Sequence, residues 1–549
     1  MPAKRHVLSS SIVISLLCAG AVMAQDMPLS ANESNPVTLR WMQGFPPASD
    51  KIIRFTNPDY FAFPKLRWTV CNFRSLMPTT AVRNRSEGAD VLPVYLDAGI
   101  DGVTFTPLGS DETMTWDAAF DANYTDAILV LHRGRIVYER YDGCMTEHAL
   151  HGAMSVTKSI TGLIGEVLVA EGQLDETALM GDLIPELADS AFGDATVRQV
   201  LDMTTALDYS EDYSDPEADV WTYAQVGSPL PPPAGYEGPR SYFGFLETVR
   251  KAGEHGEAFG YRTINTDAIG WLIARTTGQN VADWLAQNVW TRIGTEREAF
   301  YTVDSIGTPF AGGGFNATLR DMGRLGQLIL NNGVWNGEQI LPPGAIARIR
   351  EGGDPEVFAK DGYDLLPDWS YRGMWWVSHD DHGAVAERGV HGQTIWIDPT
   401  AEMVIVRFAS NPVAGNAASD PTSLPAYRAV ADYLMAQGSA PRLQGADWMI
   451  EDVDGRGVVD GSAASLTFGP EGQLSGNATC NLILGNYDEK DGSIALIPVA
   501  TTMMACPDAL MEQERRVLDI LNGPVTYEIT PDAALILSGT DGRIIVARR

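Results

Sequence analysis

Hydrophobic and polar positions alternate most clearly over residues 126–141. The sequence there, DAILVLHRGRIVYERY, predicts two β-strands joined by a turn at Arg133-Gly134. The period then changes to that of a helix, and Gly172 ends the run. The apolar positions of this predicted helix are Ile160, Leu163, Ile164, Val167 and Leu168.

The rest of the pattern completes one large unit. Residues 175–300 are mostly helical with long loops, and residues 318–332 open with Thr-x-x-Asp, which is typical of a helix start. Residues 373–410 alternate as antiparallel strands, and a closing helix follows. Strands, helices, then strands again predict an α/β (α+β) fold. We expect an antiparallel sheet flanked by helices, a helical lobe at about 196–300, and a cleft between them.

A second unit begins after Gly438-Ser439-Ala440-Pro441, which breaks the pattern. Residues 445–549 read as short alternating strands separated by Gly and Asp turns, with one helix near 509–521. We therefore predict a domain over 25–440 and a small, mainly β domain over 441–549. Residues 25–110 are rich in Pro, Asn and aromatic residues and predict an irregular segment wrapped on the larger domain.

The first 24 residues have the pattern of a signal peptide. Lys4, Arg5 and His6 precede an apolar stretch over 7–21. Small or medium residues follow at 22 and 24, the −3 and −1 positions of a cleavage site. Cleavage after Ala24 is expected, so the protein would be periplasmic or secreted. The alternative is an uncleaved anchor, but the apolar stretch is short for a bilayer. We expect no membrane span after signal cleavage.

Composition narrows the possible ligands and partners. The formal net charge of −32 disfavours nucleic acid as a partner. His379-Asp380-Asp381-His382 stands where a hairpin needs polar residues, so no metal is expected. No glycine-rich phosphate loop lies between a strand and a helix, and no cofactor is predicted. Oligomeric state stays open.

An exported protein can form disulfides, and four cysteines follow residue 24. Cys480 and Cys506 both fall in the small domain and are the candidate pair. A pairing of Cys71 with Cys144 stays open.

The stretch HGAMSVTKSITGLI, residues 151–164, contains the first candidate chemistry. Ser155 and Lys158 stand at i and i+3, so one helical turn places them on the same face. Burial and a helix N-terminus both disfavour the charge of a lysine, and a neutral lysine can take the proton of a serine hydroxyl. The alternative is that Ser155 caps a helix and Lys158 extends to solvent.

Two further stretches complete a possible site. Tyr261 and Asn265 precede an apolar helix. A lysine nearby could lower the pKa of the tyrosine enough for it to shuttle protons. The Asn265 amide could contact a substrate carbonyl. The alternative is a packed tyrosine and a capping asparagine. Glycines in Gly389-Val390-His391-Gly392-Gln393 would let a substrate approach the backbone, and the N–H of Gln393 could stabilise an oxyanion. The alternative there is a tight entry into a strand.

Together these motifs resemble the serine β-lactamase and penicillin-binding-protein superfamily. The tyrosine second motif resembles the class C branch. HGAMSVTKSITGLIGEVL, LDYSEDYSDPEADV and GVHGQTIWIDP most resemble the 6-aminohexanoate-dimer (nylon-oligomer) hydrolases, over roughly residues 37–437. The resemblance implies a β-lactamase/transpeptidase-like fold and a serine hydrolase that cleaves a small amide or ester through an acyl-enzyme.

The resemblance also implies roles for individual residues. Ser155 would be the acylated nucleophile, Lys158 and Tyr261 the proton shuttle, and the backbone N–H groups of Ser155 and Gln393 the oxyanion hole. Substrate would contact Tyr213 on the acidic loop 209–219, and also Asn265, His391 and Gly392. The last hundred residues resemble the META domain, on LTFGPEGQLSGNATCNLILGNY and TTMMACPDALMEQE.

The chain departs from the superfamily pattern in two ways. It has no S-D-N or K-T-G; Val390 takes the place of a lysine or histidine that helps hold a β-lactam carboxylate. Asn265 lies four residues after Tyr261, where the lactamase motif is Tyr-x-Asn. A β-lactamase or D-amino-acid peptidase is therefore the alternative enzyme. A non-catalytic envelope binding protein, or a META domain that acts as an interaction module, are the alternatives of another class.

Overall fold

The computed structural model describes residues 28–437 except 87, 214 and 233, and residues 443–548 except 445–446, 470–471, 491–492 and 531–533. The predicted signal peptide and the predicted boundary at 438–441 lie outside the described residues. The two parts of the chain are considered separately below.

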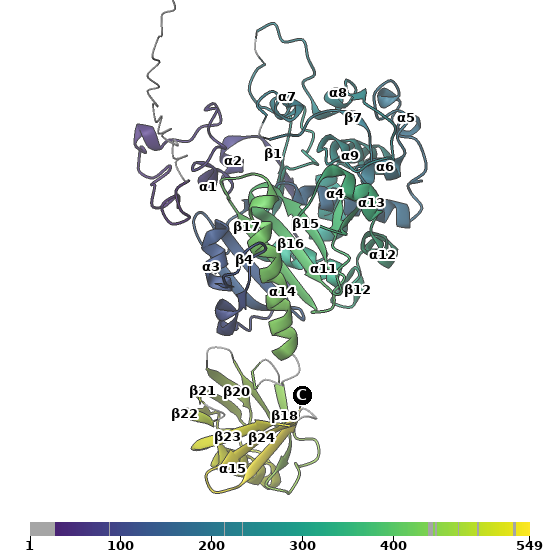
Figure 1. The fold of residues 1–549 in the computed structure, drawn as a ribbon. Coiled ribbons are helices and arrows are strands. Elements are labelled where there is room, and N and C mark those ends of the chain that lie inside the picture. The colour runs from purple at the N-terminus through teal and green to yellow at the C-terminus, as the bar shows by residue number, and fades with distance from the viewer. Residues whose placement is uncertain are drawn as a thin grey trace, which may run out of the picture.

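A seven-stranded antiparallel sheet forms the centre of the larger part (Figure 1). The hairpin predicted at its end is confirmed, and Arg133 and Gly134 both have positive φ, 51° and 75°. That backbone matches the twist of two adjoining strands. In spatial order the strands are β13 Ser370–Arg372, β14 Trp375–Val377, β15 Val385–Gly389, β16 Gln393–Asp398, β17 Met403–Ala409, β4 Thr125–His132 and β5 Arg135–Tyr141.

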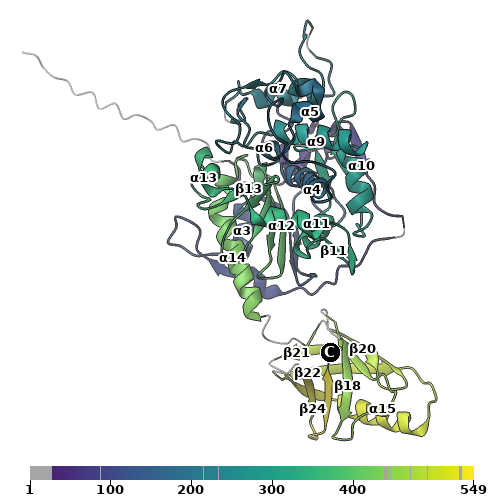
Figure 2. The same ribbon diagram turned by 90° about the vertical axis from the view of Figure 1, so that its right-hand side faces the viewer.

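Helices cover both faces of this sheet, which explains why β4 is almost continuously hydrophobic. Figures 1 and 2 place α11 (Leu319–Leu330) and α14 (Asp420–Gln437) on opposite sides. α11 approaches closely because Gly326 faces the sheet, where a Cβ would lie 2.5 Å from Val404 Cγ1. On the other face, the ring of Tyr427 in α14 packs 5.7 Å from that of Trp396 in β16.

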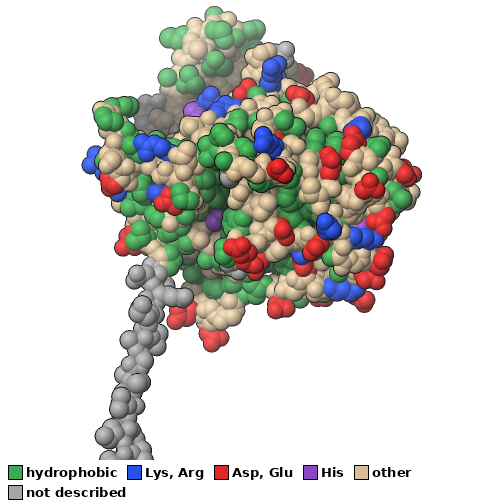
Figure 3. Space-filling view, turned by 90° about the horizontal axis from the view of Figure 1, so that it is seen from above, with side chains coloured by type: hydrophobic (Ala, Val, Ile, Leu, Met, Phe, Trp, Pro, Cys, Tyr) green, Lys and Arg blue, Asp and Glu red, His purple; other side chains and the backbone are tan. Residues whose placement is uncertain are grey.

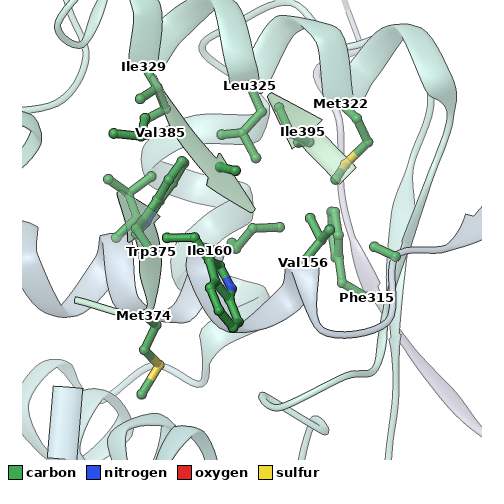
Figure 4. Close-up of a cluster of buried hydrophobic side chains, with 14 of the residues drawn as sticks. Val156, Ile160, Phe315, Met322, Leu325, Ile329, Met374, Trp375, Val385 and Ile395 are labelled. Carbon is green, nitrogen blue, oxygen red and sulfur yellow. The ribbon is translucent and has the colours of Figure 1, made fainter. Parts of the chain in front are cut away.

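Helix α4 (Val156–Ala170) is the long buried helix that the pattern predicts. Residues 156–168 of it are all buried, more than a single apolar stripe requires. In Figure 4, Val156 and Ile160 lie beneath Leu325 of α11 and Ile395 of the sheet. The first turn of α4 is therefore held from several sides by core packing.

The helical lobe packs against α4 through α9 (Ile264–Thr277). A second, four-stranded sheet lies beside it in the order β1-β9-β10-β6. These strands are β1 Thr79–Val82, β9 Ala299–Thr302, β10 Phe315–Ala317 and β6 His151–Gly152. The other lobe helices are α6 Val197–Leu201, α7 Asp219–Val226, α8 Tyr242–Leu246 and α10 Val281–Leu285.

The irregular N-terminal segment is tied to the larger part by covalent and ionic contacts. Arg67 of the short helix α1 (Leu66–Thr69) forms a fully buried ion pair with Asp126, Nη2 to Oδ1 at 3.0 Å. Cys71 is bonded to Cys144. The segment is therefore part of the same core.

The C-terminal part is a closed eight-stranded barrel with α15 (Asp508–Leu521) packed on it. Trp448, fully buried, belongs to its separate hydrophobic core. Cys480 is bonded to Cys506. The strands are β18 Asp447–Val453, β19 Ser465–Phe468, β20 Gln473–Asn477, β21 Leu482–Lys490, β22 Ser493–Thr501, β23 Pro524–Ile529, β24 Ala534–Gly539 and β25 Ile544–Arg548.

Acidic and basic side chains are interspersed on the face seen from above (Figure 3). Within the described parts of the chain, no helix combines the length and the apolar character needed to cross a membrane.

Candidate active site

Ser155 stands immediately before the first residue of α4. The preceding residue, Met154, has a positive φ of 48°, so the chain turns sharply into the helix. Ala153 is held by a hydrogen bond from its N–H to the carbonyl of Phe315, at 2.8 Å. The N-terminus of a helix carries a partial positive charge, which suits an oxyanion formed at Ser155.

Lys158 lies one turn further on and points back at Ser155. Its Nζ donates to Ser155 Oγ at 2.8 Å and to the carbonyl of Gly312 at 2.6 Å. The side chain is only 1% exposed. Burial lowers the pKa of Lys158 to about 8, while Glu211 and Asp267 offset part of that decrease. A lysine with this pKa is partly neutral near neutral pH and can accept a proton.

Tyr261 also lies close to the amine of Lys158, with its ring centroid 5.2 Å from Nζ. Burial raises the pKa of Tyr261 well above its ordinary value, and a hydrogen bond with Ser155 counteracts only part of this. The expectation that this tyrosine titrates low is therefore wrong for this site, because burial outweighs the hydrogen bond with Ser155 and the charge of Arg388. Tyr261 is a neutral hydroxyl that can pass a proton on.

These side chains open into a cavity of about 510 Å³. Ser155, Tyr261 and Tyr213 line it, so the structure brings three of the predicted residues together. Tyr213 donates to Glu211 Oε1 at 2.8 Å. The remaining lining residues are Glu211, Arg262, Asp361, Gly362, Tyr363, Asp364, Leu365, Leu366, Trp376, Arg388, Val390, Gly415, Asn416, Ala417 and Asp420.

Charged side chains give the cavity its polarity. Glu211 accepts hydrogen bonds from the backbone and hydroxyl of Thr263, which hold its carboxylate in place. Arg388 is paired with Asp420 and lies 5.0 Å from the ring of Trp376. The sequence reasoning missed both. Glu211 lies in the acidic loop already singled out, whereas Arg388 follows an ordinary strand pattern.

The glycine-rich stretch passes beside Ser155 at Gly389. A Cβ on Gly389 would lie 2.9 Å from Ser155 N. The next residue, Val390, lines the cavity. Gln393 does not line it: its side-chain amide donates to the carbonyl of Ala409 at 2.6 Å. Val390, and not Gln393, therefore borders the substrate space together with Ser155.

His391, Gly392 and Asn265 are also absent from the cavity wall. His391 Nδ1 lies 2.7 Å from the carbonyl of Asn411, and its ring packs edge-on to Phe61. Gly392 has a φ of 97°, which suits glycine and shapes the turn. Asn265 is fully buried inside α9, where its Oδ1 accepts from Thr205 at 2.7 Å. α9 begins at Ile264, so Asn265 is not its cap.

The described residues contain no group of three or more His, Cys, Asp or Glu side chains able to hold a metal ion. His379 Nε2 instead lies 2.7 Å from Ser370 Oγ, and His382 Nδ1 lies 2.6 Å from Asp398. His379 and His382 thus stabilise the hairpin through contacts with neighbouring strands.

A serine activated by a buried lysine at a helix N-terminus, beside an antiparallel sheet and a helical lobe, defines a serine hydrolase. Residues 118–427 match the Beta-lactamase family model and residues 441–549 match the META domain model. The chain therefore belongs to the beta-lactamase family and carries a C-terminal META domain.

Two relatives indicate the branch. The chain is 34% identical, over 356 residues, to a 6-aminohexanoate-dimer hydrolase of Paenarthrobacter ureafaciens; the match covers 64% of this chain and 86% of the relative. A solved structure from Bacillus anthracis, assigned provisionally to the same activity, has 31% identity and a TM-score of 0.64. It covers 71% of this chain and 99% of that one. The resemblance read from the motifs is confirmed.

Proposed function

We propose that the protein hydrolyses a small amide or ester through an acyl-enzyme on Ser155, with linear amides of the 6-aminohexanoate-dimer kind as the first class to test. The observation that carries this proposal is the 2.8 Å contact between Lys158 Nζ and Ser155 Oγ in a buried setting. The relative's name supplies the substrate class.

The proposed reaction uses neutral Lys158 as the base. Its amine takes the proton of Ser155 while Oγ attacks the substrate carbonyl carbon, and the oxyanion forms at the N-terminus of α4. The proton then passes through Tyr261 to the departing amine or alcohol oxygen, and the carbon–heteroatom bond breaks. A water molecule, deprotonated by the same groups, attacks the acyl-enzyme and releases the acid.

The second oxyanion donor in this proposal is the N–H of Val390. Gln393 was the candidate from the motif, but Val390 lines the cavity with Ser155 and directly follows Gly389. Tyr213, with Glu211, would contact the substrate from the opposite wall.

A covalent probe tests the nucleophile. Mature protein from residue 25 is incubated with a fluorophosphonate, and the adduct is mapped by mass spectrometry. We expect one adduct on Ser155, none in Ser155→Ala, and normal labelling in Ser159→Ala, which removes the neighbouring buried serine of α4. An unlabelled wild type, beside a related hydrolase that labels, would refute the acyl-enzyme.

The substrate class is tested on mature protein that has not met the probe, with 6-aminohexanoate dimer, p-nitrophenyl esters and nitrocefin. Fast nitrocefin turnover with no linear amide or ester cleavage would favour the β-lactamase alternative. Export to the periplasm or medium remains part of the proposal. It predicts that the N-terminal residue of protein recovered from there is Gln25.

A further inference from the structure

A second cavity lies behind the active site, next to α9. Its volume is about 200 Å³, and it shares no lining residue with the substrate cavity. Asp267 of α9 is the one charged residue on its wall. The other lining residues are apolar or neutral: Phe243, Gly270, Ala274, Asn280, Val281, Ile306, Gly307, Thr308, Pro309 and Ala311.

Asp267 is connected to Lys158 through one glycine. Its Oδ1 accepts the N–H of Gly312 at 3.3 Å, and the carbonyl of Gly312 accepts from Lys158 Nζ at 2.6 Å. The loop can come this close only because residue 312 has no side chain. A Cβ there would lie 2.5 Å from Thr263 Cγ2 and 3.0 Å from Asp267 Oδ2.

The second oxygen of Asp267 is not used by this connection. Among the residues that the structure describes, none makes a well-aligned hydrogen bond to Oδ2, although the Tyr223 hydroxyl interacts with this carboxyl and the side chain is 1% exposed. A buried carboxylate oxygen that is poorly satisfied is costly. Its retention beside the catalytic lysine calls for a reason beyond packing.

We propose that Asp267 is a positioning residue for the hydrolysis: it holds the Gly312 carbonyl against Lys158, and its charge sets the pH at which Lys158 becomes a base. This inference rests on the proposed function for its role in turnover. The second cavity borders this carboxyl and shares no lining residue with the substrate cavity.

The ionisable groups around Asp267 support this role. Burial raises its pKa to about 7, and Lys158 of α4 is among the groups that lower it. The other groups near it are Tyr223 of α7, Tyr242 of α8 and Tyr209, all neutral because burial raises the pKa of each. Glu211 and Asp267 both raise the pKa of Lys158. Asp267 and Lys158 therefore titrate as a coupled pair near neutral pH.

The sign of the effect follows from charge. A carboxylate at Asp267 favours the ammonium form of Lys158, so removing that charge must lower the lysine pKa. Asp267→Asn keeps an oxygen for the Gly312 N–H, removes the charge and replaces the other carboxylate oxygen by an NH2 group. Asp304→Asn is the matched control, because Asp304 is also a buried carboxylate and bonds to Ile306 and Thr308 in the loop beside the second cavity.

The test measures Lys158 directly, by ¹³Cε-lysine NMR of the full mature chain between pH 5 and 10. Six lysines follow residue 24, and Lys158→Arg assigns the signal of Lys158 among them. In Asp267→Asn we expect the Lys158 midpoint to fall by roughly half a unit to one unit, with no change in Asp304→Asn. The acid limb of kcat/KM should move by the same amount, with KM within about twofold.

An unchanged Lys158 midpoint in folded Asp267→Asn overturns the inference. Should that variant not fold, the wild type decides: the Lys158 signal should show a second inflection near pH 7, and a single inflection refutes the coupling. If Lys158 shifts as expected but no substrate is cleaved and no probe labels Ser155, the proposed hydrolysis fails while the coupling stands.

Discussion

Gly389 can be tested as the residue that lets β15 lie against the nucleophile. In Gly389→Ala the new Cβ would meet two backbone atoms, Ser155 N and Ala153 O, both at 2.9 Å. Ordinary contact begins at about 3.4 Å, so the strand and the start of α4 must separate by about 0.5 Å. Neither partner can rotate away, because both atoms belong to the main chain.

That displacement sets the expected loss. A misplacement of about 1 Å at a reacting centre can cost about 10²-fold in rate, so half of it should cost about tenfold, or about 1.4 kcal/mol of transition-state stabilisation. Overpacking should also lower the free energy of unfolding by about 1–3 kcal/mol. The activity loss should persist at temperatures where the variant is fully folded.

The assay is kcat/KM on a p-nitrophenyl ester, together with the rate of phosphonate labelling at Ser155. Gly102→Ala is the control: Gly102 lies outside the cavity wall, has no positive φ, and a Cβ there meets nothing within 4 Å. We expect it to be active within about twofold. If folded Gly389→Ala matches it, the strand does not position the oxyanion site as argued.

Two predictions concern stability. Replacing Cys71 and Cys144 by serine opens a bond across 73 positions and should lower the free energy of unfolding by about 4 kcal/mol. Calorimetry should show the melting temperature of the larger domain lowered by several degrees. An unchanged melting temperature would contradict this. Burial raises the pKa of Glu387 well above its ordinary value. Folding therefore takes up a proton at Glu387, and the contribution of this residue to stability falls as the pH rises above its unfolded pKa. Glu387→Gln should therefore raise the melting temperature at pH 8 more than at pH 5, and an equal change at both pH values would exclude protonation as the cause.

Local pattern predicted those parts of the fold that depend on near neighbours in the chain. Arg133-Gly134 predicts the turn between β4 and β5, and the helical spacing after residue 155 predicts α4. Ser155 and Lys158 meet because three residues are nearly one helical turn. The family resemblance came from short motifs of the same local kind.

Contacts between distant segments were not predictable in the same way. Which residue borders Ser155 depends on how β15 meets α4: the motif alone favoured Gln393, whereas Val390 lines the cavity with Ser155. Asn265 could be read as a cap or a substrate contact, yet it packs inside α9 on Thr205. No pattern predicted the high pKa of Tyr261, because it results from burial among distant segments, including Tyr371 and Trp376 of the sheet.

What the sequence by itself determined was the periodic elements, the Ser155–Lys158 pair and the family. The tertiary structure alone decided the cavity wall, the charge state of Tyr261 and the link from Asp267 through Gly312 to Lys158. The physical reason is that periodicity and helix geometry act over a few residues, whereas desolvation and charge coupling depend on every segment packed around a group. Asp267 and Gly312 are 45 positions apart, and only the fold brings them within hydrogen-bonding distance.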